Sequence, residues 1–427
     1  MPPETTVADS PLLVRARIAL AGVALLLLFT LVPLSLEGDG HGRWQALSES
    51  FASGQIREVR YSYLGPLFAS PFLLFDNRTL ETWWAMRFNI LVLAAGAAAS
   101  WWMLRGVLSP AARSAFVVLL VVGGMMPFHV RDFYGEVFTA VLVATGLAMV
   151  IAAGLRAGWI ALVIGAANTP ASALPVLLVA LWRFARTRRY DGLVAVACIT
   201  ALVIAENTVV RGDPFATGYA GDHGHRTVMP FSGRPGFSYP LSLGIPSLLF
   251  SFGKGLLFFA PGLLLVLHAR RVAPRPVAEL LDAWTILVAG LVLVYAQWWS
   301  WYGGWYWGPR FLLVAVYPSA LALACTLTFP VTGGRALAAS ALAAWTLWVG
   351  VSGVAYGLHG QDICMADNYA LEHLCWYAPE FSPLFRPLAI PIGFDRWQRA
   401  WTLVAFASAA SLILPVALKR SPRHRSS

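Results

Sequence analysis

The chain has 427 residues, of which 58% are hydrophobic and 12% are charged. A soluble domain carries about twice that charged fraction, so the composition excludes an ordinary soluble protein and predicts a polytopic membrane protein. The formal net charge of +10 comes from basic residues that border the apolar runs, which argues against nucleic acid as a partner.

Apolar runs predict an all-α polytopic fold of about twelve transmembrane helices. They lie near 17–36, 83–104, 114–128, 136–154, 157–168, 170–184, 191–207, 254–269, 281–299, 311–329, 335–356 and 399–418. Several are shorter than the roughly 20 residues of a free-standing span, and short, broken helices are tolerated where they line a cavity in a bundle. We assign 1–16 to a cytoplasmic N-terminus, 17–418 to the transmembrane domain and 419–427 to a basic cytoplasmic tail.

Arginines and lysines gather at one end of the predicted spans. This basic face contains Arg15, Arg17, Arg105, Arg113, Arg156, Arg183, Arg186, Arg188, Arg189, Arg270, Arg271, Arg275, Arg335, Lys419, Arg420, Arg423 and Arg425. By the positive-inside rule this face is cytoplasmic, which predicts a multi-pass protein of the cytoplasmic (inner) membrane with both termini inside. The long loops 37–82, 207–253, 299–310 and 357–398 then face outward.

The first outward loop begins with two acids, Glu37 and Asp39, directly after the first span. Glycines flank Asp39 on both sides and leave room for a ligand. The alternative is that Asp39 only caps a helix or is solvated in the loop. Further along this loop, the run 63–72 is apolar but too short to cross a bilayer, so it predicts an interfacial or re-entrant helix.

Other charged residues lie where later outward loops meet the spans. Asp132 and Glu136 precede or open the fourth span, where helix capping is the alternative to a functional role, because the helix macrodipole favours acids there. Lys254 lies in a glycine-rich turn, and snorkelling to the membrane interface is the alternative for this lysine and for Arg310.

The most distinctive segment is 298–310, which reads WWSWYGGWYWGPR; we call it the Trp-rich loop. Aromatic belts anchor helices at the membrane interface, but this loop also contains glycines and ends in Gly-Pro-Arg. Flat rings such as those of Trp305 and Trp307 stack on sugars and isoprenoid chains, and Arg310 can bind phosphate through its planar fork. The loop therefore predicts a ligand site.

Taken in order, these features resemble the GT-C glycosyltransferases, membrane enzymes that use polyprenyl-phosphate sugars. The shared features are an acid just after the first span, a long outward first loop and about a dozen spans. Four segments carry the resemblance: an acid opening a span in 131–136, the N…G-x-P…G-Y-like run 207–219, the SPGKGL-like turn 251–256 with Phe252 in place of Pro, and the W-x-GG-x-x-WGPRFL-like Trp-rich loop.

This resemblance implies an inverting transfer of sugar from a polyprenyl-phosphate donor, at the outer face of the membrane, to a glycolipid, glycan or protein. In such a transfer Asp39 is our candidate base, with Glu37 as the fallback, and Glu136 a second acid that holds donor or acceptor. Fixed cations stabilise the leaving phosphate. The expected phosphate ligands are Arg310, Lys254 and Arg131, the last of which could instead pair with Glu136. The expected donor or acceptor contacts are Glu37, Trp305, Trp307 and Tyr219.

The histidines and cysteines of the outward loops leave a metal site and a disulfide open. His223 and His225, close to Asp222, could bind a metal, but a flexible polar loop is the favoured interpretation, so we assign no metal ligand. No cofactor is assigned with certainty, and a divalent metal stays open because members of the superfamily differ. Cys364 and Cys375 share one polar loop, where they can form a disulfide if the loop faces an oxidising compartment.

Two other classes of protein compete with the enzyme. A secondary transporter or flippase of lipid-linked sugars would place ionisable residues at mid-membrane, whereas the acids here gather in outward loops. A non-catalytic membrane scaffold would have no need of Asp39, Glu136, Lys254 and Arg310 on one face. The sequence leaves open the sugar, the acceptor and the oligomeric state.

Overall fold

The computed structural model describes residues 10–75, 77–219, 226–329 and 333–418. Every regular element in these ranges is a helix, which confirms the all-α fold class. Three parts of the predictions lie outside the described residues: 1–9 of the N-terminus, the tail 419–427, and the pair His223 and His225.

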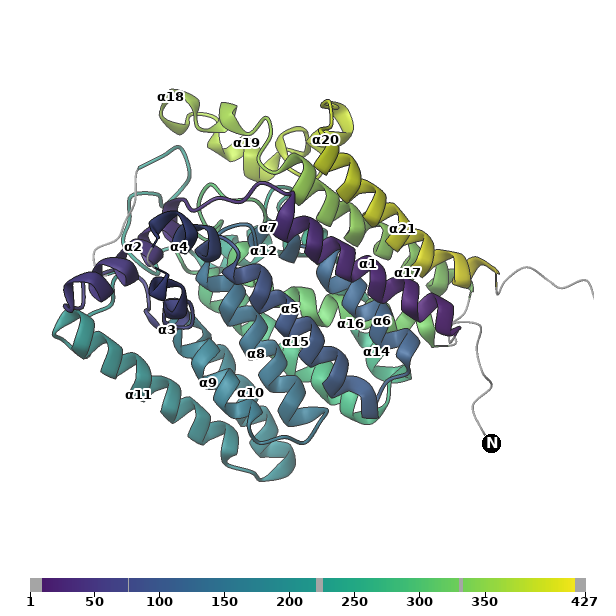
Figure 1. The fold of residues 1–427 in the computed structure, drawn as a ribbon, viewed down its shortest axis with the longest axis horizontal. Helices are drawn as coiled ribbons and strands as arrows, with labels where there is room; N and C mark the ends of the chain where they lie inside the picture. The colour runs from purple at the N-terminus through teal and green to yellow at the C-terminus, as the bar shows by residue number, and fades with distance from the viewer. Residues whose placement is uncertain (1–9, 76, 220–225, 330–332, 419–427) are drawn as a thin grey trace, which may run out of the picture.

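Long helices form a bundle (Figure 1). They are α1 (Pro11–Thr30), α5 (Phe88–Met103), α6 (Pro110–Val121), α8 (Gly135–Ile151), α9 (Gly158–Ala167), α10 (Ala173–Thr187), α11 (Asp191–Arg211), α12 (Leu241–Phe250), α15 (Arg275–Tyr295), α16 (Val316–Thr328), α17 (Gly333–Val351) and α21 (Arg396–Leu418). Among the described residues, seven helical segments are long and apolar enough to cross a membrane. The chain is therefore a multi-pass membrane protein, and the number twelve stays a prediction.

Short helices and turns connect the bundle. They are α2 (Gly38–Ser53), α3 (Leu64–Leu67), η2 (Ser70–Leu74), α4 (Arg78–Ala85), η3 (Leu104–Gly106), α7 (Met126–His129), η4 (Pro170–Ser172), α13 (Leu256–Phe259), η5 (Pro261–Leu265), α14 (Val266–Val272), η6 (Arg310–Ala315), η7 (Ser352–Tyr356), η8 (Asp362–Cys364), α18 (Ala366–Tyr369), α19 (Glu372–Tyr377), η9 (Pro379–Phe381) and α20 (Arg386–Ala389). The predicted helix at 63–72 corresponds to α3 and η2.

One predicted span differs clearly from the structure. The run 254–269 is divided into α13, η5 and α14. Pro261 has no N–H to continue α13, and Gly262 lies so close to α16 that its N–H bonds the Ser319 hydroxyl at 3.0 Å. The break lets the chain pack closely against α16 inside the bundle.

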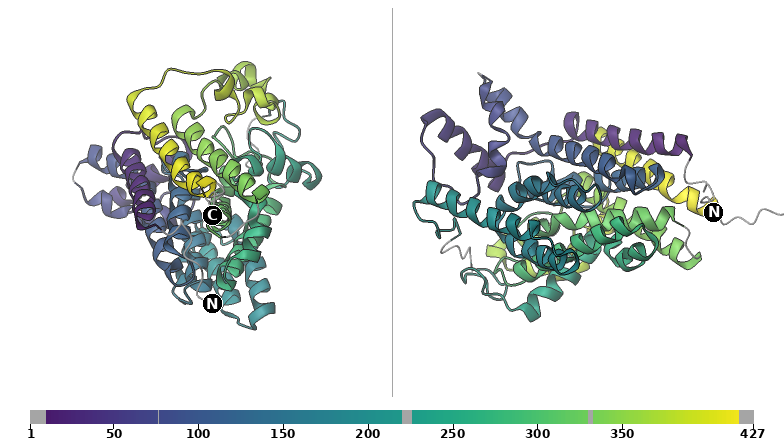
Figure 2. Two further views of the ribbon diagram at one scale, coloured as in Figure 1. Left: turned by 90° about the vertical axis from the view of Figure 1, so that its right-hand side faces the viewer. Right: turned by 90° about the horizontal axis from the view of Figure 1, so that it is seen from below.

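The first and last long helices, α1 and α21, lie side by side (Figure 2). Arg17 on α1 joins them by donating to the backbone oxygen of Ser411, 2.6 Å away, and to that of Ala111 on α6, 3.2 Å away. α1 begins and α21 ends at the same end of the bundle, whereas α2 and the segment α18–α20 lie toward the other end (Figure 1). This second end carries the candidate site.

Candidate active site

The first turn of α2 places Asp39 at the candidate site. Gly38 begins the helix with φ of 50°, a left-handed value that glycine adopts without strain. Glu37 precedes it at the N-cap, and its backbone N–H donates to Asp132 Oδ2 at 3.2 Å. Asp132 also accepts from the Ser35 hydroxyl at 3.0 Å and from the N–H of Phe133 at 2.6 Å. Asp132 therefore fixes the start of α2 against the segment that leads into α8.

Both carboxylate oxygens of Asp39 have partners from distant parts of the chain. The Tyr61 hydroxyl donates to Oδ1 at 2.7 Å, and Arg310 Nη1 donates to Oδ2 at 2.8 Å. The same Nη1 lies 3.6 Å from Glu136 Oε1 in the first turn of α8. The structure thus brings together three of the predicted site residues, Asp39, Glu136 and Arg310. We call these three residues, with Tyr61, the carboxylate–arginine cluster.

The environment of Asp39 favours its charged form. Burial opposes ionisation, but the Arg310 guanidinium and the Tyr61 hydroxyl outweigh that effect, so the pKa of Asp39 lies below its ordinary value. Burial and the Asp39 charge raise the pKa of Tyr61, which therefore stays a hydrogen-bond donor. The cluster presents an ionised carboxylate at neutral pH.

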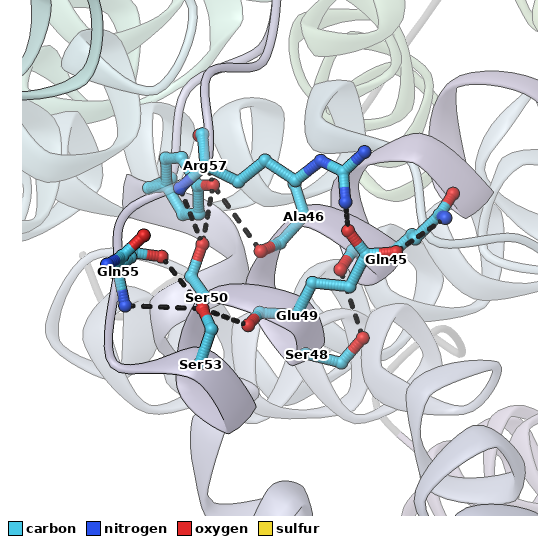
Figure 3. A network of polar contacts seen from close by, with 9 residues as sticks. Gln45, Ala46, Ser48, Glu49, Ser50, Ser53, Gln55 and Arg57 are labelled. Carbon is cyan, nitrogen blue, oxygen red and sulfur yellow. Dashed lines mark hydrogen bonds and ion pairs between the residues drawn. The ribbon is translucent and has the colours of Figure 1, made fainter.

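A network of polar contacts ties Arg57, on the segment that leads to Tyr61, to α2 (Figure 3). The Ser50 hydroxyl accepts from the Arg57 N–H at 2.9 Å, and the Tyr63 hydroxyl donates to the Arg57 backbone oxygen at 2.6 Å. An ion pair between Arg57 and Glu49 adds to this network. These contacts hold the segment after α2, which delivers the Tyr61 hydroxyl to Asp39.

The end of α11 holds the same segment from the other side. Arg211 donates to the backbone oxygens of Val59 and Tyr61 at 2.7 and 3.4 Å, and to the Asn207 side-chain oxygen at 2.8 Å. Asn207 in turn donates to the Pro214 backbone oxygen at 3.3 Å. The 207–219 motif therefore supports the partner of Asp39 from behind.

Arg43 is a site residue that the sequence reasoning missed. It is 7% exposed, and its guanidinium lies 4.5 Å from the Tyr61 ring centroid. It also lies so close to Gly135 that a Cβ there would be 2.7 Å from the guanidinium carbon. Its Nε and Nη1 have no hydrogen-bond partner within the described ranges. The signal was its place one helical turn after Asp39, which puts both on one face once α2 is known to be a helix.

Lys254 is buried at 1% exposure under the Trp-rich loop. Its ammonium group donates to the backbone oxygens of Gly304 and Gly308, both at 3.1 Å, and to that of Tyr306. Burial, and then the Arg310 charge, lower its pKa well below the ordinary value. With three donors bonded to three carbonyls, Lys254 fits a role in shaping the loop that carries Arg310 better than the predicted direct contact with phosphate.

The side chains of Arg131 and Glu37 do not join the carboxylate–arginine cluster. Arg131 Nε donates to the Pro33 oxygen at 3.0 Å and its Nη1 to the Val354 oxygen at 3.3 Å, so it joins the end of α1 to η7. Glu136 has its ion-pair contact with Arg310, not with Arg131. The Glu37 side chain is exposed, and Glu37 contacts Asp132 through its backbone N–H.

The predicted aromatic contacts also separate into different environments. Trp307 is fully buried and packs on Phe259, with ring centroids 5.0 Å apart, which makes it a core residue of the loop. Trp305 is half-buried and stacks on Tyr369 at 5.2 Å. Tyr219 is 40% exposed, and the charges of the carboxylate–arginine cluster act on its hydroxyl. Trp305 and Tyr219 are thus the two that remain available to a ligand.

Cys364 and Cys375, whose pairing the sequence leaves open, form a disulfide. Among the described residues there is no group of three or more His, Cys, Asp or Glu side chains that could hold a metal ion.

No family model matches the sequence, and no curated protein matches it. Two solved structures are similar to the chain: ArnT from Cupriavidus metallidurans bound to undecaprenyl phosphate, and the same protein in the apo state. Their TM-scores are 0.52 and 0.53 at 16% identity, over 94% and 93% of this chain and 76% of the ArnT chain. The chain therefore has the fold of ArnT, in agreement with the GT-C-like fold that the ordered motifs predicted.

Proposed function

We propose that this protein is a polyprenyl-phosphate-dependent glycosyltransferase of the GT-C type that acts at the outer face of the cytoplasmic membrane. The observation that carries the proposal is the ion pair of Asp39 with Arg310, which joins a potential base to a potential phosphate ligand 271 positions along the chain. Support comes from the fold, which resembles that of a protein bound to undecaprenyl phosphate.

The cluster supplies the groups that direct displacement needs. Asp39 accepts the proton of the acceptor hydroxyl as its oxygen attacks the anomeric carbon. The bond from that carbon to the phosphate oxygen breaks, and the phosphate leaves with the electron pair, which inverts the anomeric carbon. Arg310 and Arg43 stabilise the charge on the departing phosphate, and Glu136 keeps Arg310 in position.

The resting ion pair suggests an order of events. Arg310 Nη1 donates a hydrogen bond to Asp39 Oδ2 in this structure, so this oxygen is not free to accept a proton from the acceptor hydroxyl. A donor phosphate competes for the same guanidinium, and its binding frees Oδ2 for the acceptor hydroxyl. This exchange ties activation of the base to the presence of the donor.

Two observations support action at the outer face. The disulfide segment packs against the Trp-rich loop, since Trp305 and Trp376 lie 5.1 Å apart, and disulfides persist in oxidising compartments. The basic residues lie at the opposite ends of the predicted spans, as the positive-inside rule requires of a cytoplasmic face.

An apolar groove of about 440 Å³ between α5 and α8 is a separate feature. Its α8 lining includes Phe138, Leu142 and Thr145. Phe138 lies two residues after Glu136, about 200° around the helix, so the groove and the carboxylate–arginine cluster are on different sides of α8. We assign this groove to membrane lipid and not to the reacting sugar.

The transporter or flippase remains the second hypothesis, and the position of the charges disfavours it. Asp39, Glu136 and Arg310 each lie in the first turn of their helix, at one end of the bundle. A transporter needs ionisable groups near mid-membrane, often in two matched halves.

A panel of labelled polyprenyl-phosphate sugars tests the proposal. The donors carry mannose, arabinofuranose, glucose or galacturonic acid, and are supplied to membranes with and without the protein. We expect one donor to be consumed, with label in a glycolipid, glycan or protein fraction and release of polyprenyl phosphate. Movement of intact donor across the membrane without transfer would instead establish the flippase.

A further inference from the structure

The short helix α19 covers the Trp-rich loop and the Lys254 turn together. The Trp376 backbone oxygen accepts from the Gly253 N–H at 3.0 Å. The Trp376 ring lies 4.8 Å from Lys254 Nζ, 5.0 Å from the Tyr302 ring and 5.1 Å from the Trp305 ring. One residue of α19 thus touches the lysine and two rings of the loop that the lysine holds.

Glu372 is the buried acid of this helix, with 0% exposure. Trp376 Nε1 donates to its Oε1 at 3.4 Å, and its negative charge acts on the Lys254 ammonium. Burial raises the pKa of Glu372, and the nearby lysine opposes that effect. The hydrogen bond from Trp376 therefore holds Glu372 under the loop.

The segment before α19 is strained. Asp367, Asn368 and Tyr369 have φ of 48°, 55° and 64°, a run of three left-handed residues, whereas residues other than glycine, Asp and Asn included, adopt this conformation singly. Such strain persists only where the surrounding structure enforces it. Here the Cys364–Cys375 disulfide closes the loop around these residues, and Tyr369 stacks on Trp305 with an interplanar angle of 21°.

We infer that the disulfide-bonded segment 364–377 positions the Trp-rich loop for catalysis, and that Glu372 is a positioning residue that acts through Lys254 on Arg310. The contacts run from Glu372 to Trp376, from the Trp376 ring to Lys254, and from Lys254 to the backbone oxygens of Gly304, Tyr306 and Gly308. Arg310 follows two residues later. This inference rests on the proposed function.

The Cys364–Cys375 disulfide also makes activity depend on oxidation of these two thiols. Its formation takes two thiols to one disulfide and gives two protons and two electrons to a thiol oxidant of the outer compartment. The catalytic loop therefore reaches its working shape only after the segment has arrived on the oxidising side of the membrane. Until then, the strained turn is free to relax and withdraw Tyr369 from Trp305.

The test measures sugar transfer by the purified full chain before and after dithiothreitol, with free thiols counted by maleimide labelling. A shift of about 1 Å in a positioning element can cost about 100-fold in rate. We expect reduction, or the double change Cys364→Ser and Cys375→Ser, to lower kcat by about 10- to 100-fold. The KM for donor should rise by a smaller factor than kcat falls, because Arg43, the second expected phosphate contact, lies outside this segment.

Matched variants identify the cause. Cys198→Ser removes an exposed free cysteine on α11 and should stay as sensitive to dithiothreitol as wild type. The double change Asp367→Gly and Asn368→Gly removes the left-handed strain and should make transfer less sensitive to reduction. Glu372→Gln keeps the side-chain shape without the charge and should lower kcat in the oxidised protein, with activity restored by Glu372→Asp.

Three results are decisive against the inference. It is wrong if fully reduced wild type keeps its kcat, or if Glu372→Gln transfers sugar at the wild-type rate. It is equally wrong if reduction abolishes the helical circular dichroism, because the bond then supports the whole fold. Absence of transfer by oxidised wild type with every donor would refute the proposed function instead, before any reduction is made.

Discussion

Arg310→Gln is the substitution that most sharply perturbs the carboxylate–arginine cluster. It keeps a polar side chain but leaves Asp39 and Glu136 without the cation that lies 2.8 and 3.6 Å from their oxygens. Loss of one fixed donor to a developing oxyanion typically costs 100- to 1,000-fold in kcat, or about 2.7–4 kcal/mol. Because Arg310 also lowers the pKa of Asp39, the substitution should raise that pKa as well.

The assay compares initial transfer rates over a range of donor concentrations. We expect Arg310→Gln to lower kcat/KM by 100- to 1,000-fold, and Arg310→Lys by about tenfold, since an ammonium keeps the charge but lacks the planar fork. Arg275→Gln is the matched control, because Arg275 is highly exposed and forms its ion pair with Glu279, away from the cluster. Thermal unfolding of each variant checks that the fold survives.

A double-mutant cycle tests the coupling between Asp39 and Arg310. Asp39→Asn and Arg310→Gln share one hydrogen bond, so their effects on the activation free energy should not add, and the double variant should be little worse than the worse single one. Transfer by folded Arg310→Gln within threefold of wild type would refute the role of this arginine. Strict additivity would refute the coupling.

Three further outcomes follow from other residues near the cluster. Burial raises the pKa of Asp132 to about 6, so protonation of Asp132 below that pH should slow transfer. Because this pKa exceeds the ordinary value of 3.8, the contribution of Asp132 to the free energy of unfolding should rise as the pH falls from 6 to 4. Asp132→Asn should remove both effects. Gly38→Ala should lower activity and destabilise the protein by more than Gly54→Ala, measured by thermal unfolding, because both have positive φ but only the first places a Cβ against the Tyr306 hydroxyl. Arg43→Gln should raise the donor KM by about 10- to 150-fold, which corresponds to the loss of one charge-assisted hydrogen bond of about 1.5–3 kcal/mol. A wild-type donor KM in the folded Arg43→Gln variant would show that Arg43 does not bind phosphate.

Hydropathy was sufficient to predict the helical bundle, because a long apolar run inside a membrane satisfies its backbone hydrogen bonds by forming a helix. Hydropathy did not predict α2, whose first five residues include Gly38, Gly40 and Gly42, residues that disfavour helix. This helix forms because Asp132 bonds its start from outside. Without α2, the face shared by Asp39 and Arg43 could not be recognised.

The functions of single side chains depended on loop conformation and were harder to predict. The order of the motifs was enough to single out Asp39, Glu136 and Arg310. Lys254 looked like a phosphate ligand by position, but its environment depends on how the Trp-rich loop turns its carbonyls inward. The pairing of Tyr61 with Asp39 likewise depends on contacts from α11, far away in sequence.

Single-turnover transfer by purified Asp39→Asn tests the central claim most directly. The variant is compared with wild type, using the donor identified by the panel, and donor binding is measured separately. We expect transfer to fall by about 100- to 10,000-fold while donor still binds, because the amide cannot accept the proton of the acceptor hydroxyl. Wild-type transfer by folded Asp39→Asn would contradict the assignment of Asp39 as the base.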